Sequence, residues 1–307
     1  MLSVLLATHN GADTIDRTLA AMGEMDAPEG GWRLVVVNNA STDDTGARVL
    51  KWRDRLPLDY LVEPKLGKSS ALNTALDHAV GDLIVMTDDD VLPDRDWLTE
   101  WRRMADAYPG LSVFGGRTDP EFDGPPPAWP LEDGCLTVLY GKTPRQPEGE
   151  IEPINVSGAN MAIRKSISDQ GWRFSKRFLI GTSGLMGEDS DFVKRLAAKG
   201  HKVGFAPNVR VRHIIHKTQM SWYWMHRRYI RHGRTIFMLE DVRRDEGSNQ
   251  RVFRFPWWRL RKGLQSILQL LMTLPSRDRA RIFRQTRILA YDLGAIGQAL
   301  TLVRKQR

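Results

Sequence analysis

The sequence contains one cysteine, Cys135, among 307 residues. A lone cysteine excludes an intramolecular disulfide and a thiolate metal cluster, so we expect a reducing, cytoplasmic environment. The chain opens on a strand-like run, Leu2–Ala7, without the basic stretch and cleavage site of a signal peptide. It also lacks a continuous apolar run of the roughly 20 residues that a membrane-spanning helix needs. We therefore expect neither a secreted nor a membrane-spanning protein.

Charge is distributed unevenly along the chain. Residues 1–209 carry a net charge of −8, residues 210–255 carry +7 and residues 256–307 carry +9, which give the total of +8. A positive C-terminal surface attracts anionic lipid headgroups or a phosphorylated substrate. Nucleic acid is the rival partner. No recognisable nucleic-acid-binding motif is present, so we do not expect the protein to bind nucleic acid.

The first half of the chain alternates β-rich runs with helical patterns, which is typical of βαβ units and a mainly parallel sheet. Four strands are predicted, at Leu2–Ala7, Leu34–Val37, Asp59–Val62 and Leu83–Met86, with helices beginning near Asp13, Thr42, Ser69 and Asp96. Three of the strands are followed by polar clusters, which are Thr8-His9-Asn10, Asn38-Asn39 and Thr87-Asp88-Asp89-Asp90. Because ligands of open α/β sheets bind beyond the carboxyl ends of the strands, we expect these clusters to share one crevice.

The second half of the chain is less regular. We expect a surface loop over Pro120–Pro130, because proline is too stiff and donor-poor for a central strand. The patterns beyond it indicate an element over Asn155–Arg164, a glycine-rich loop through Gly181, Gly184 and Gly187, a helix over Asp189–Lys199 and a strand near Val203–Ala206 that closes the fold.

Two basic amphipathic helices are predicted after Pro256. Apolar residues recur at helical spacing, at Trp257, Leu260, Leu264, Ile267, Leu271 and Leu274 in the first helix, and at Ile282, Leu289, Leu293, Ile296, Leu300 and Val303 in the second, where we expect them to be buried. Arginines crowd the first turns of the second helix. Such a pair suits the interfacial plane of a membrane, or it packs on the folded domain with a solvated basic face.

Asp88, Asp89 and Asp90 are consecutive carboxylates at the end of an apolar strand. Like charges this close repel one another, and a divalent cation relieves the repulsion. Mg²⁺ and Mn²⁺ take one or two carboxylates and complete their coordination with phosphate oxygens. The trio therefore predicts a metal–diphosphate site with Mg²⁺ or Mn²⁺ as cofactor, and a solvated loop is the alternative.

The sequence resembles glycosyltransferase family two over roughly residues 1–215. The resemblance rests on six strings in order, which are SVLLATHN, VVVNNASTDDT, GKSSALNTAL, VMTDDDVLPDRDWL, SGANMAIRK and GEDSDFVKRL. It implies an α/β fold of the GT-A type, with a Rossmann-like, mainly parallel central sheet flanked by helices. It also implies a nucleoside diphosphate sugar as donor, a divalent metal ion and inversion at the anomeric carbon.

The resemblance assigns donor-binding roles. Thr8 and Asn10 would line the nucleotide pocket, and Asn38, where the family usually has aspartate, would face the base. Lys68 would contact the nucleotide, with a solvated lysine at a helix start as the alternative. The metal motif has two registers, because Asp88-x-Asp90 is the direct match and alignment on the following Val91-Leu92-Pro93 moves the ligand to Asp89. All three carboxylates remain candidates.

Further roles fall in the second half of the domain. Asp189 resembles the catalytic base of the family, and Glu188, which precedes it, is the second candidate catalytic residue; both lie at a helix start, where the helix dipole keeps a carboxylate ionised. A helix cap is the alternative reading of this pair. The sugar and acceptor pocket would be shaped by Gly158, Ala159 and Asn160, while Arg164 either pairs with phosphate or caps a strand, and His213 is either a metal ligand or structural.

We therefore predict three parts: a glycosyltransferase domain over residues 1–215, with its nucleotide-binding part at about 1–115 and its acceptor part at about 116–215; a basic-aromatic connecting segment over 216–255; and a basic helical appendage over 256–307. Processive members usually carry Q-x-x-R-W where this chain has QMSWYW. We thus expect non-processive transfer to a hydroxyl of a glycan or lipid-linked glycan, by an enzyme peripheral at the inner face of the cell membrane. A sugar-phosphate nucleotidyltransferase is disfavoured by the loop ATHNGAD. A catalytically silent sugar-nucleotide-binding protein, or a basic protein that binds nucleic acid or membrane, is the alternative.

Overall fold

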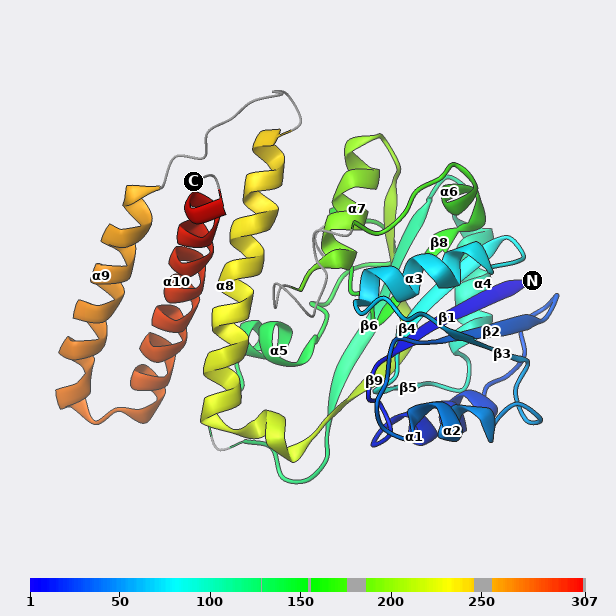
Figure 1. Ribbon diagram of the computed structural model, residues 1–307, viewed down its shortest axis with the longest axis horizontal. Helices are drawn as coiled ribbons and strands as arrows, with labels where there is room; N and C mark the ends of the chain where they lie inside the picture. The colour runs from blue at the N-terminus through cyan, green and yellow to red at the C-terminus, as the bar shows by residue number, and fades with distance from the viewer. Residues whose placement is uncertain (128, 154–155, 176–185, 246–255, 306–307) are drawn as a thin grey trace. The chain divides into compact units, whose positions relative to one another are not determined.

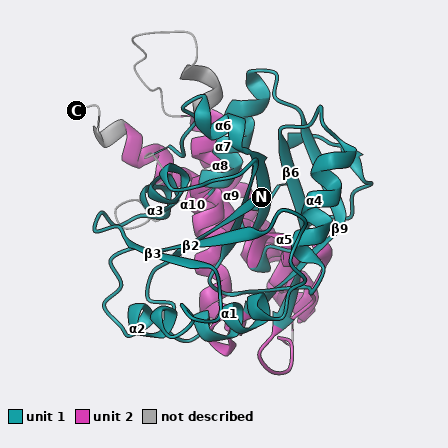
Figure 2. Cartoon of the chain, turned by 90° about the vertical axis from the view of Figure 1, so that its right-hand side faces the viewer, with its two compact units in different colours: residues 1–121, 140–183, 187–214 teal, residues 122–139, 184–186, 215–307 magenta. Residues whose placement is uncertain are grey.

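The structure, a computed structural model, describes residues 1–127, 129–153, 156–175, 186–245 and 256–305. The chain forms two compact units (Figure 2). Unit 1 comprises residues 1–121, 140–183 and 187–214, and unit 2 comprises residues 122–139, 184–186 and 215–307.

One mixed sheet is formed by nine strands within the described residues. The strands are β1 (Leu2–Thr8), β2 (Trp32–Asn38), β3 (Leu58–Val62), β4 (Leu83–Asp88), β5 (Val91–Pro93), β6 (Val113–Phe122), β7 (Gly149–Glu150), β8 (Asn160–Arg164) and β9 (Val203–Ile215). Their order is β3-β2-β1-β4-β8-β6-β9-β5, and β7 also pairs with β9. The first four strands of that order run parallel, whereas β8 pairs antiparallel with β4 and with β6.

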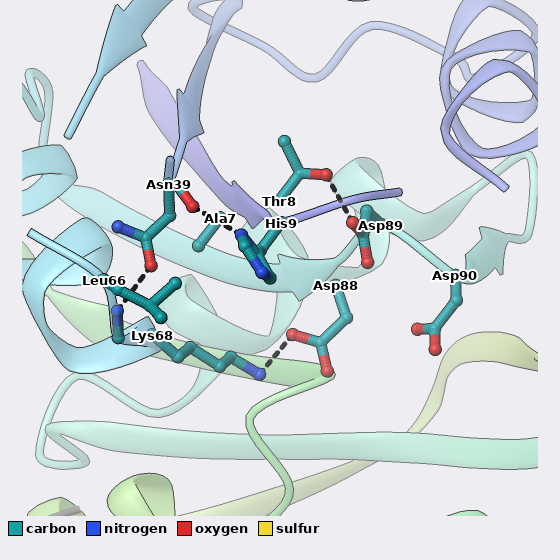
Figure 3. Close-up of a pocket in the computed structure, with 10 residues that line it drawn as sticks. Ala7, Thr8, His9, Asn39, Leu66, Lys68, Asp88, Asp89 and Asp90 are labelled. Atoms are coloured by element: carbon teal, nitrogen blue, oxygen red, sulfur yellow. Dashed lines mark hydrogen bonds and ion pairs between the residues drawn. The ribbon is translucent and has the colours of Figure 1, made fainter. Parts of the chain in front are cut away.

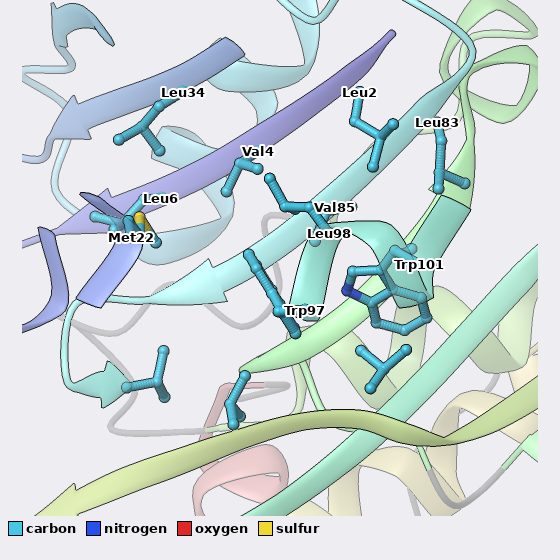
Figure 4. Packing of buried hydrophobic residues seen from close by; sticks show 14 of the residues in the cluster. Leu2, Val4, Leu6, Met22, Leu34, Leu83, Val85, Trp97, Leu98 and Trp101 are labelled. Atoms are coloured by element: carbon cyan, nitrogen blue, oxygen red, sulfur yellow. The ribbon is translucent and has the colours of Figure 1, made fainter. Parts of the chain in front are cut away.

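Helices cover both faces of the sheet (Figure 1). They are α1 (Ile15–Gly23), α2 (Thr45–Leu50), α3 (Lys68–Asp77), α4 (Trp97–Ala107), α6 (Lys165–Asp169) and α7 (Glu188–Ala198). Because side chains of a strand alternate between its faces, Val4 and Leu6 pack with α1 and α4 in one apolar cluster, while Leu5 packs with α3 and α7 in another. Figure 4 shows the first cluster, where Trp97 and Trp101 of α4 lie beneath β1 and β4.

The α/β fold with a central sheet flanked by helices is confirmed, and the first four strands end within two residues of their predicted bounds. Two predictions at prolines were wrong. The loop expected from Pro120 starts later, because β6 continues to Phe122, beyond the residues Val113–Gly115 that pair with β8. The strand expected to end at Ala206 runs on to Ile215. Its Pro207 lies between the residues that pair with β7 and those that pair with β5, so the missing N–H breaks neither pairing.

Unit 2 is mainly helical. Its elements include α5 (Asp133–Tyr140, of which residues 133–139 belong to this unit), the short 3₁₀ helices η3 (Lys217–Met220) and η4 (Leu274–Ser276), α8 (Trp222–Asp245), α9 (Trp257–Thr273) and α10 (Arg279–Lys305). α10 lies between α8 and α9 (Figure 1). Trp129, from the proline-rich loop, is buried against Trp222 and Phe283.

The burial predicted for α10 was wrong at Leu293 and Leu300, which are exposed; the side chain of Val303 lies outside the described residues. The buried positions are instead small residues such as Ala295 and Ala299. α8 and α10 approach so closely that a Cβ on Gly233 would overlap the backbone of Tyr291. Among the described helices, none has both the length and the apolar character required to cross a bilayer.

Candidate active site

A cavity of about 290 Å³ opens in unit 1 at the carboxyl ends of β1, β2 and β4 (Figure 3). Its lining consists of Ala7, Thr8, His9, Asn39, Leu66, Gly67, Lys68, Asp88, Asp89 and Asp90. The three polar clusters that follow these strands in the sequence therefore all contribute to one site, as parallel pairing of β1 with β2 and β4 requires.

Lys68 is the first residue of α3, and the loop before it is held by hydrogen bonds. Gly67, which caps the helix, has φ of 136°, a backbone conformation that favours glycine. The side chain of Asn39 holds this loop, because its Oδ1 accepts the Gly67 N–H at 2.7 Å and its Nδ2 donates to the Glu63 and Lys65 carbonyls at 3.0 and 2.9 Å. The carboxyl end of β2 thus fixes the start of α3.

The Lys68 ammonium joins two acidic groups that are 100 residues apart in the chain. It forms an ion pair with Asp88, at the end of β4, and lies 3.8 Å from Oε1 of Glu188, at the start of α7. Burial acts to lower the pKa of Lys68, but Asp88 and Glu188 outweigh it and hold that pKa above its ordinary value. Burial raises the pKa of Glu188, and Lys68 offsets part of this effect. We call these three residues the Lys68 cluster.

Asp89 faces β1. Its carboxylate accepts a hydrogen bond from the Thr8 hydroxyl (Figure 3), and its backbone carbonyl accepts one from the Thr18 hydroxyl at 3.0 Å. Gly11 leaves the room for this side chain, because a Cβ there would overlap both the Asp89 carboxylate and the Thr8 hydroxyl. Burial, with repulsion from Asp90, raises the pKa of Asp89 to about 7.

Asp90 faces β9. Pairing of Val91 with His213 brings the two strands together, and Nε2 of His213 lies 3.1 Å from Oδ2 of Asp90. Nδ1 of the same imidazole lies 2.7 Å from the Tyr140 carbonyl. Burial disfavours charge on both partners, but their mutual attraction outweighs it, so the pKa of Asp90 is lowered and the pKa of His213 is raised. His213 lies within β9 and not beyond the closing strand as expected.

No three His, Cys, Asp or Glu side chains in the described part of the chain lie close enough together to hold a metal ion alone. The three aspartates instead diverge toward Lys68, Thr8 and His213, while all of them line the cavity. A divalent ion that takes the rest of its ligands from a diphosphate needs only one or two carboxylates. The donor set therefore fits such a shared ion and does not form a closed cage.

Asp189 is anchored to the loop before β8. Its Oδ2 accepts the Gly158 N–H at 2.6 Å, and its Oδ1 accepts the Ser190 N–H at 2.7 Å. Gly187, which precedes α7, is left-handed with φ of 104°. A Cβ on Gly158 would stand 3.1 Å from the Asp189 carboxylate, so glycine permits this close approach. Gly181 and Gly184 of the predicted glycine-rich loop lie outside the described residues.

Two predicted nucleotide-binding residues do not line the cavity. Asn10 is exposed, and its side-chain oxygen accepts the Thr42 N–H at 2.8 Å. Asn38 is buried and donates to the Tyr60 hydroxyl at 2.8 Å. In each polar cluster it is a neighbour, His9 or Asn39, that faces the cavity, and Nδ1 of His9 lies 2.7 Å from the Asn39 carbonyl.

Two residues predicted for the sugar and acceptor pocket hold the fold in place. Asn160 is fully buried, accepts the indole N–H of Trp97 at 2.8 Å and donates to the Arg117 and Val209 carbonyls at 2.9 and 3.0 Å. Arg164 pairs with Leu83, at the opposite end of β4 from the aspartates. It donates to the Ala105 and Tyr108 carbonyls at the end of α4, so the pocket placement of Arg164 was wrong.

The other two predicted pocket residues lie at the correct end of the sheet. The Ala159 carbonyl accepts a hydrogen bond from the Thr87 hydroxyl at 3.1 Å, next to Asp88, and Gly158 contacts Asp189. Leu66 and Gly67 also line the cavity and were not predicted. The signal for them was their position directly before Lys68, where a glycine opens a helix.

Comparison with known proteins identifies the family. The family model described as "Glycosyl transferase family 2" matches residues 3–172. This chain belongs to that family. The succinoglycan biosynthesis protein ExoM of Rhizobium meliloti is 28% identical over 221 residues, which cover 71% of this chain and 68% of ExoM. The glycosyltransferase AglE of Haloferax volcanii is 24% identical over 212 residues, which cover 68% of this chain and 65% of AglE.

Solved structures show the same fold. The mannosyltransferase PcManGT from Pyrobaculum calidifontis, in complex with GDP-Man and Mn²⁺, superposes with a TM-score of 0.64 at 21% identity, covering 97% of this chain and 86% of that one. Residues 1–349 of S. aureus TarS, in complex with UDP-GlcNAc, superpose with a TM-score of 0.53 at 18% identity, covering 94% of this chain and 90% of that one. The family and the GT-A fold implied by the sequence strings are confirmed.

Proposed function

We propose that this glycosyltransferase moves a sugar from a nucleoside diphosphate sugar to a hydroxyl of a glycan or lipid-linked glycan, with inversion at the anomeric carbon. The observation that carries the proposal is the Lys68 cluster, because it joins the aspartates at the end of β4 to the Glu188–Asp189 pair at the start of α7. A donor diphosphate at the first group and an acceptor at the second would then meet at one reaction centre.

The donor diphosphate would lie against Lys68 and the start of α3. A lysine at a helix N-terminus offers a positive charge and the positive end of the helix dipole to the same anion. As the sugar departs, negative charge grows on the diphosphate, and these fixed positive groups stabilise it without reorganising. Glu188, a candidate catalytic residue by sequence, would act here as a positioning residue, since its carboxylate lies 3.8 Å from the Lys68 ammonium that also pairs with Asp88.

The cavity lining carries more acidic than basic side chains, because it contains three aspartates and one lysine. Mg²⁺ or Mn²⁺ would be held by carboxylates of the trio, with Nε2 of His213 beside Asp90 as a further donor. Such an ion supplies positive charge that neutralises the leaving diphosphate. Mn²⁺ accompanies GDP-Man in the PcManGT structure, which supports an ion of this kind.

Asp189 would act as the general base. Its carboxylate is fixed by two backbone N–H groups, from Gly158 and Ser190, so it is held in one orientation beside the loop over Gly158 and Ala159. It would take the proton of the acceptor hydroxyl while that oxygen attacks the anomeric carbon from the face opposite the diphosphate. A displacement in a single step from the opposite face inverts the configuration.

We further propose non-processive addition by an enzyme that works at the inner face of the cell membrane, in the synthesis of cell-envelope polysaccharide or glycolipid. ExoM is named as a succinoglycan biosynthesis protein, and this name is consistent with an acceptor of this class.

A donor screen tests the proposal. UDP- and GDP-sugars are titrated into the full chain with and without Mn²⁺ or Mg²⁺, and binding is followed by calorimetry and donor hydrolysis by nucleotide release. We expect metal-dependent binding of at least one donor, lost in Asp88→Asn and retained in Asp106→Asn, a surface carboxylate paired with Arg102. If no donor is recognised with either ion, the proposal fails; binding without any turnover would indicate a catalytically silent sugar-nucleotide-binding protein.

A further inference from the structure

Helix α9 buries polar and small residues and exposes apolar ones, which is the reverse of the pattern in a surface helix of a water-soluble protein. Its buried residues are Arg259, Gly263, Ser266 and Thr273, which are polar or small. Its large apolar residues are exposed, with Leu264 at 62%, Leu268 and Leu271 at 57% and Met272 at 73% of their full accessible surface. A surface helix of a soluble domain buries its apolar stripe and exposes its polar face.

The inward face of α9 explains this orientation. The Ser266 hydroxyl donates to the buried Asp292 of α10 at 2.6 Å, and Arg259 donates to Glu240 of α8 at 2.6 Å. Gly263 lies against Ile296 of α10, whose Cδ1 would stand 2.8 Å from a Cβ at this position. Helices that associate in lipid use the same devices, small residues and polar pairs on the inside, because their apolar side chains gain nothing by facing inward.

The exposed apolar residues form one continuous stripe. At about 100° per residue, Leu264, Leu268 and Leu271 fall within about 60° of one another and directly opposite Ser266. No described residue of unit 2 covers this stripe, which we call the outer face of α9 and define by Leu264, Leu268, Leu271 and Met272.

Basic side chains border the outer face. Arg261 is exposed on α9 about 60° around the helix from Leu264, Lys262 is exposed on the polar flank, and Arg277, Arg279 and Arg281 are exposed at the turn into α10. Acidic residues are scarce here, since residues 256–305 contain only Asp278 and Asp292, and Asp292 is buried against Ser266. A second copy of this chain would bring two positive surfaces together, which disfavours self-association through this face. An anionic surface meets both the charge and the apolar stripe.

We propose that the outer face of α9 inserts into the headgroup region of an anionic bilayer, with the helix parallel to the membrane plane and the bordering arginines on lipid phosphates. An interfacial helix of this kind buries its apolar face roughly 5–10 Å deep without crossing the membrane. That the membrane carries a lipid-linked acceptor for this enzyme rests on the proposed function. The docking of α9 onto the bilayer does not depend on that function.

Flotation of the full chain with vesicles tests the inference. The vesicles are equimolar phosphatidylcholine and phosphatidylglycerol, or phosphatidylcholine alone, and the variants are Leu268→Glu on the outer face and Gln269→Glu on the polar flank. Both positions are exposed and receive the same charge. We expect the wild type to float with the anionic vesicles and only weakly with the neutral ones. Leu268→Glu should bind the anionic vesicles about tenfold or more weaker than Gln269→Glu, because only the first loses buried apolar surface.

Thermal unfolding and nucleotide binding with Mn²⁺ should be the same in both variants, since the substituted residues belong to unit 2 and the cavity to unit 1. Equal vesicle binding by the two variants would overturn the inference, and so would a wild type that ignores vesicles and forms dimers that Leu268→Glu dissociates. If the protein binds vesicles as expected but recognises no donor, the proposed function is refuted and the docking stands. If it turns over a donor but does not bind vesicles, the docking is refuted and the proposed glycosyl transfer stands.

Discussion

Replacing Lys68 with methionine removes the ammonium that Asp88 and Glu188 share. Methionine keeps most of the length and the apolar stem of lysine, so the change isolates the charge. The two carboxylates would then lose the positive group that they share, and each would be left partly desolvated.

The expected cost follows from how exposed the three groups are. The side chains of Lys68 and Asp88 are 24% and 25% exposed, and that of Glu188 is 8% exposed. Breaking a fully buried ion pair costs about 3–5 kcal/mol, and breaking an exposed one costs less than about 1 kcal/mol. We therefore expect Lys68→Met to lose about 2 kcal/mol of unfolding free energy, which lowers the midpoint of thermal unfolding by about 4–8 °C.

Circular dichroism melts of the two proteins measure this shift. Lys165→Met is the matched control, because Lys165 is similarly covered but its partner Asp169 is 60% exposed, so we expect a loss below about 1 kcal/mol. The turnover of Lys68→Met should also fall by about 10²–10³, as a lost electrostatic stabiliser of the leaving diphosphate. Equal melting of the two variants, with unchanged turnover, would refute the role of the Lys68 cluster.

Three further predictions concern other parts of the chain. Gly11→Ala should weaken metal-dependent nucleotide binding at least about tenfold in calorimetry, because the new Cβ displaces Asp89, whereas Gly23→Ala, which meets no atom within 4 Å, should leave it unchanged. Arg164→Met should lower the free energy of unfolding in urea by about 3 kcal/mol, because it loses charge-assisted hydrogen bonds to the end of α4. Donor affinity should stay that of the wild type. A loss of donor affinity without a loss of stability would show that Arg164 belongs to the pocket after all. Burial, with repulsion from Arg228, lowers the pKa of His232 from 6.5 to about 4, so the unfolded state binds this proton first and stability should fall by on the order of 2 kcal/mol as the pH drops from about 6.5 to 4. His232→Gln should flatten this part of the stability–pH curve, and an unchanged slope would show that His232 is not its source.

The sequence was sufficient for the parallel half of the sheet. β1, β2 and β4 are apolar runs closed by polar clusters, and parallel pairing places those clusters at one edge, so they could be predicted to share one site. Lys68 could be placed there only through the family resemblance. It was not sufficient for the face on which each member of a cluster lies. Asn38 and Asn39 have the same chemistry, but only the register of β2 decides that Asn38 turns to Tyr60 while Asn39 holds the loop before Lys68.

Long-range pairing limited the rest. Arg164 is only four residues from Asn160 in the sequence. Because β8 is extended and runs antiparallel to β4, Arg164 lies at the opposite end of β4, and only the register of this pairing reveals it. The burial of α9 and α10 could not be deduced from periodicity, because spacing predicts a stripe and not which side of it packs. Polar pairs such as Ser266 with Asp292 determine which face of α9 packs against α10.

Single-turnover transfer by Asp189→Asn is the most direct test of the account. A donor that binds the wild type in the presence of Mn²⁺ is mixed with each protein and an acceptor, and the product is quantified and its anomeric configuration read by NMR. We expect inversion in the wild type, and a rate about 10²–10⁴ lower in Asp189→Asn with donor binding intact. Transfer by Asp189→Asn at the wild-type rate, or a product that retains the donor configuration, would contradict the reaction proposed for this site.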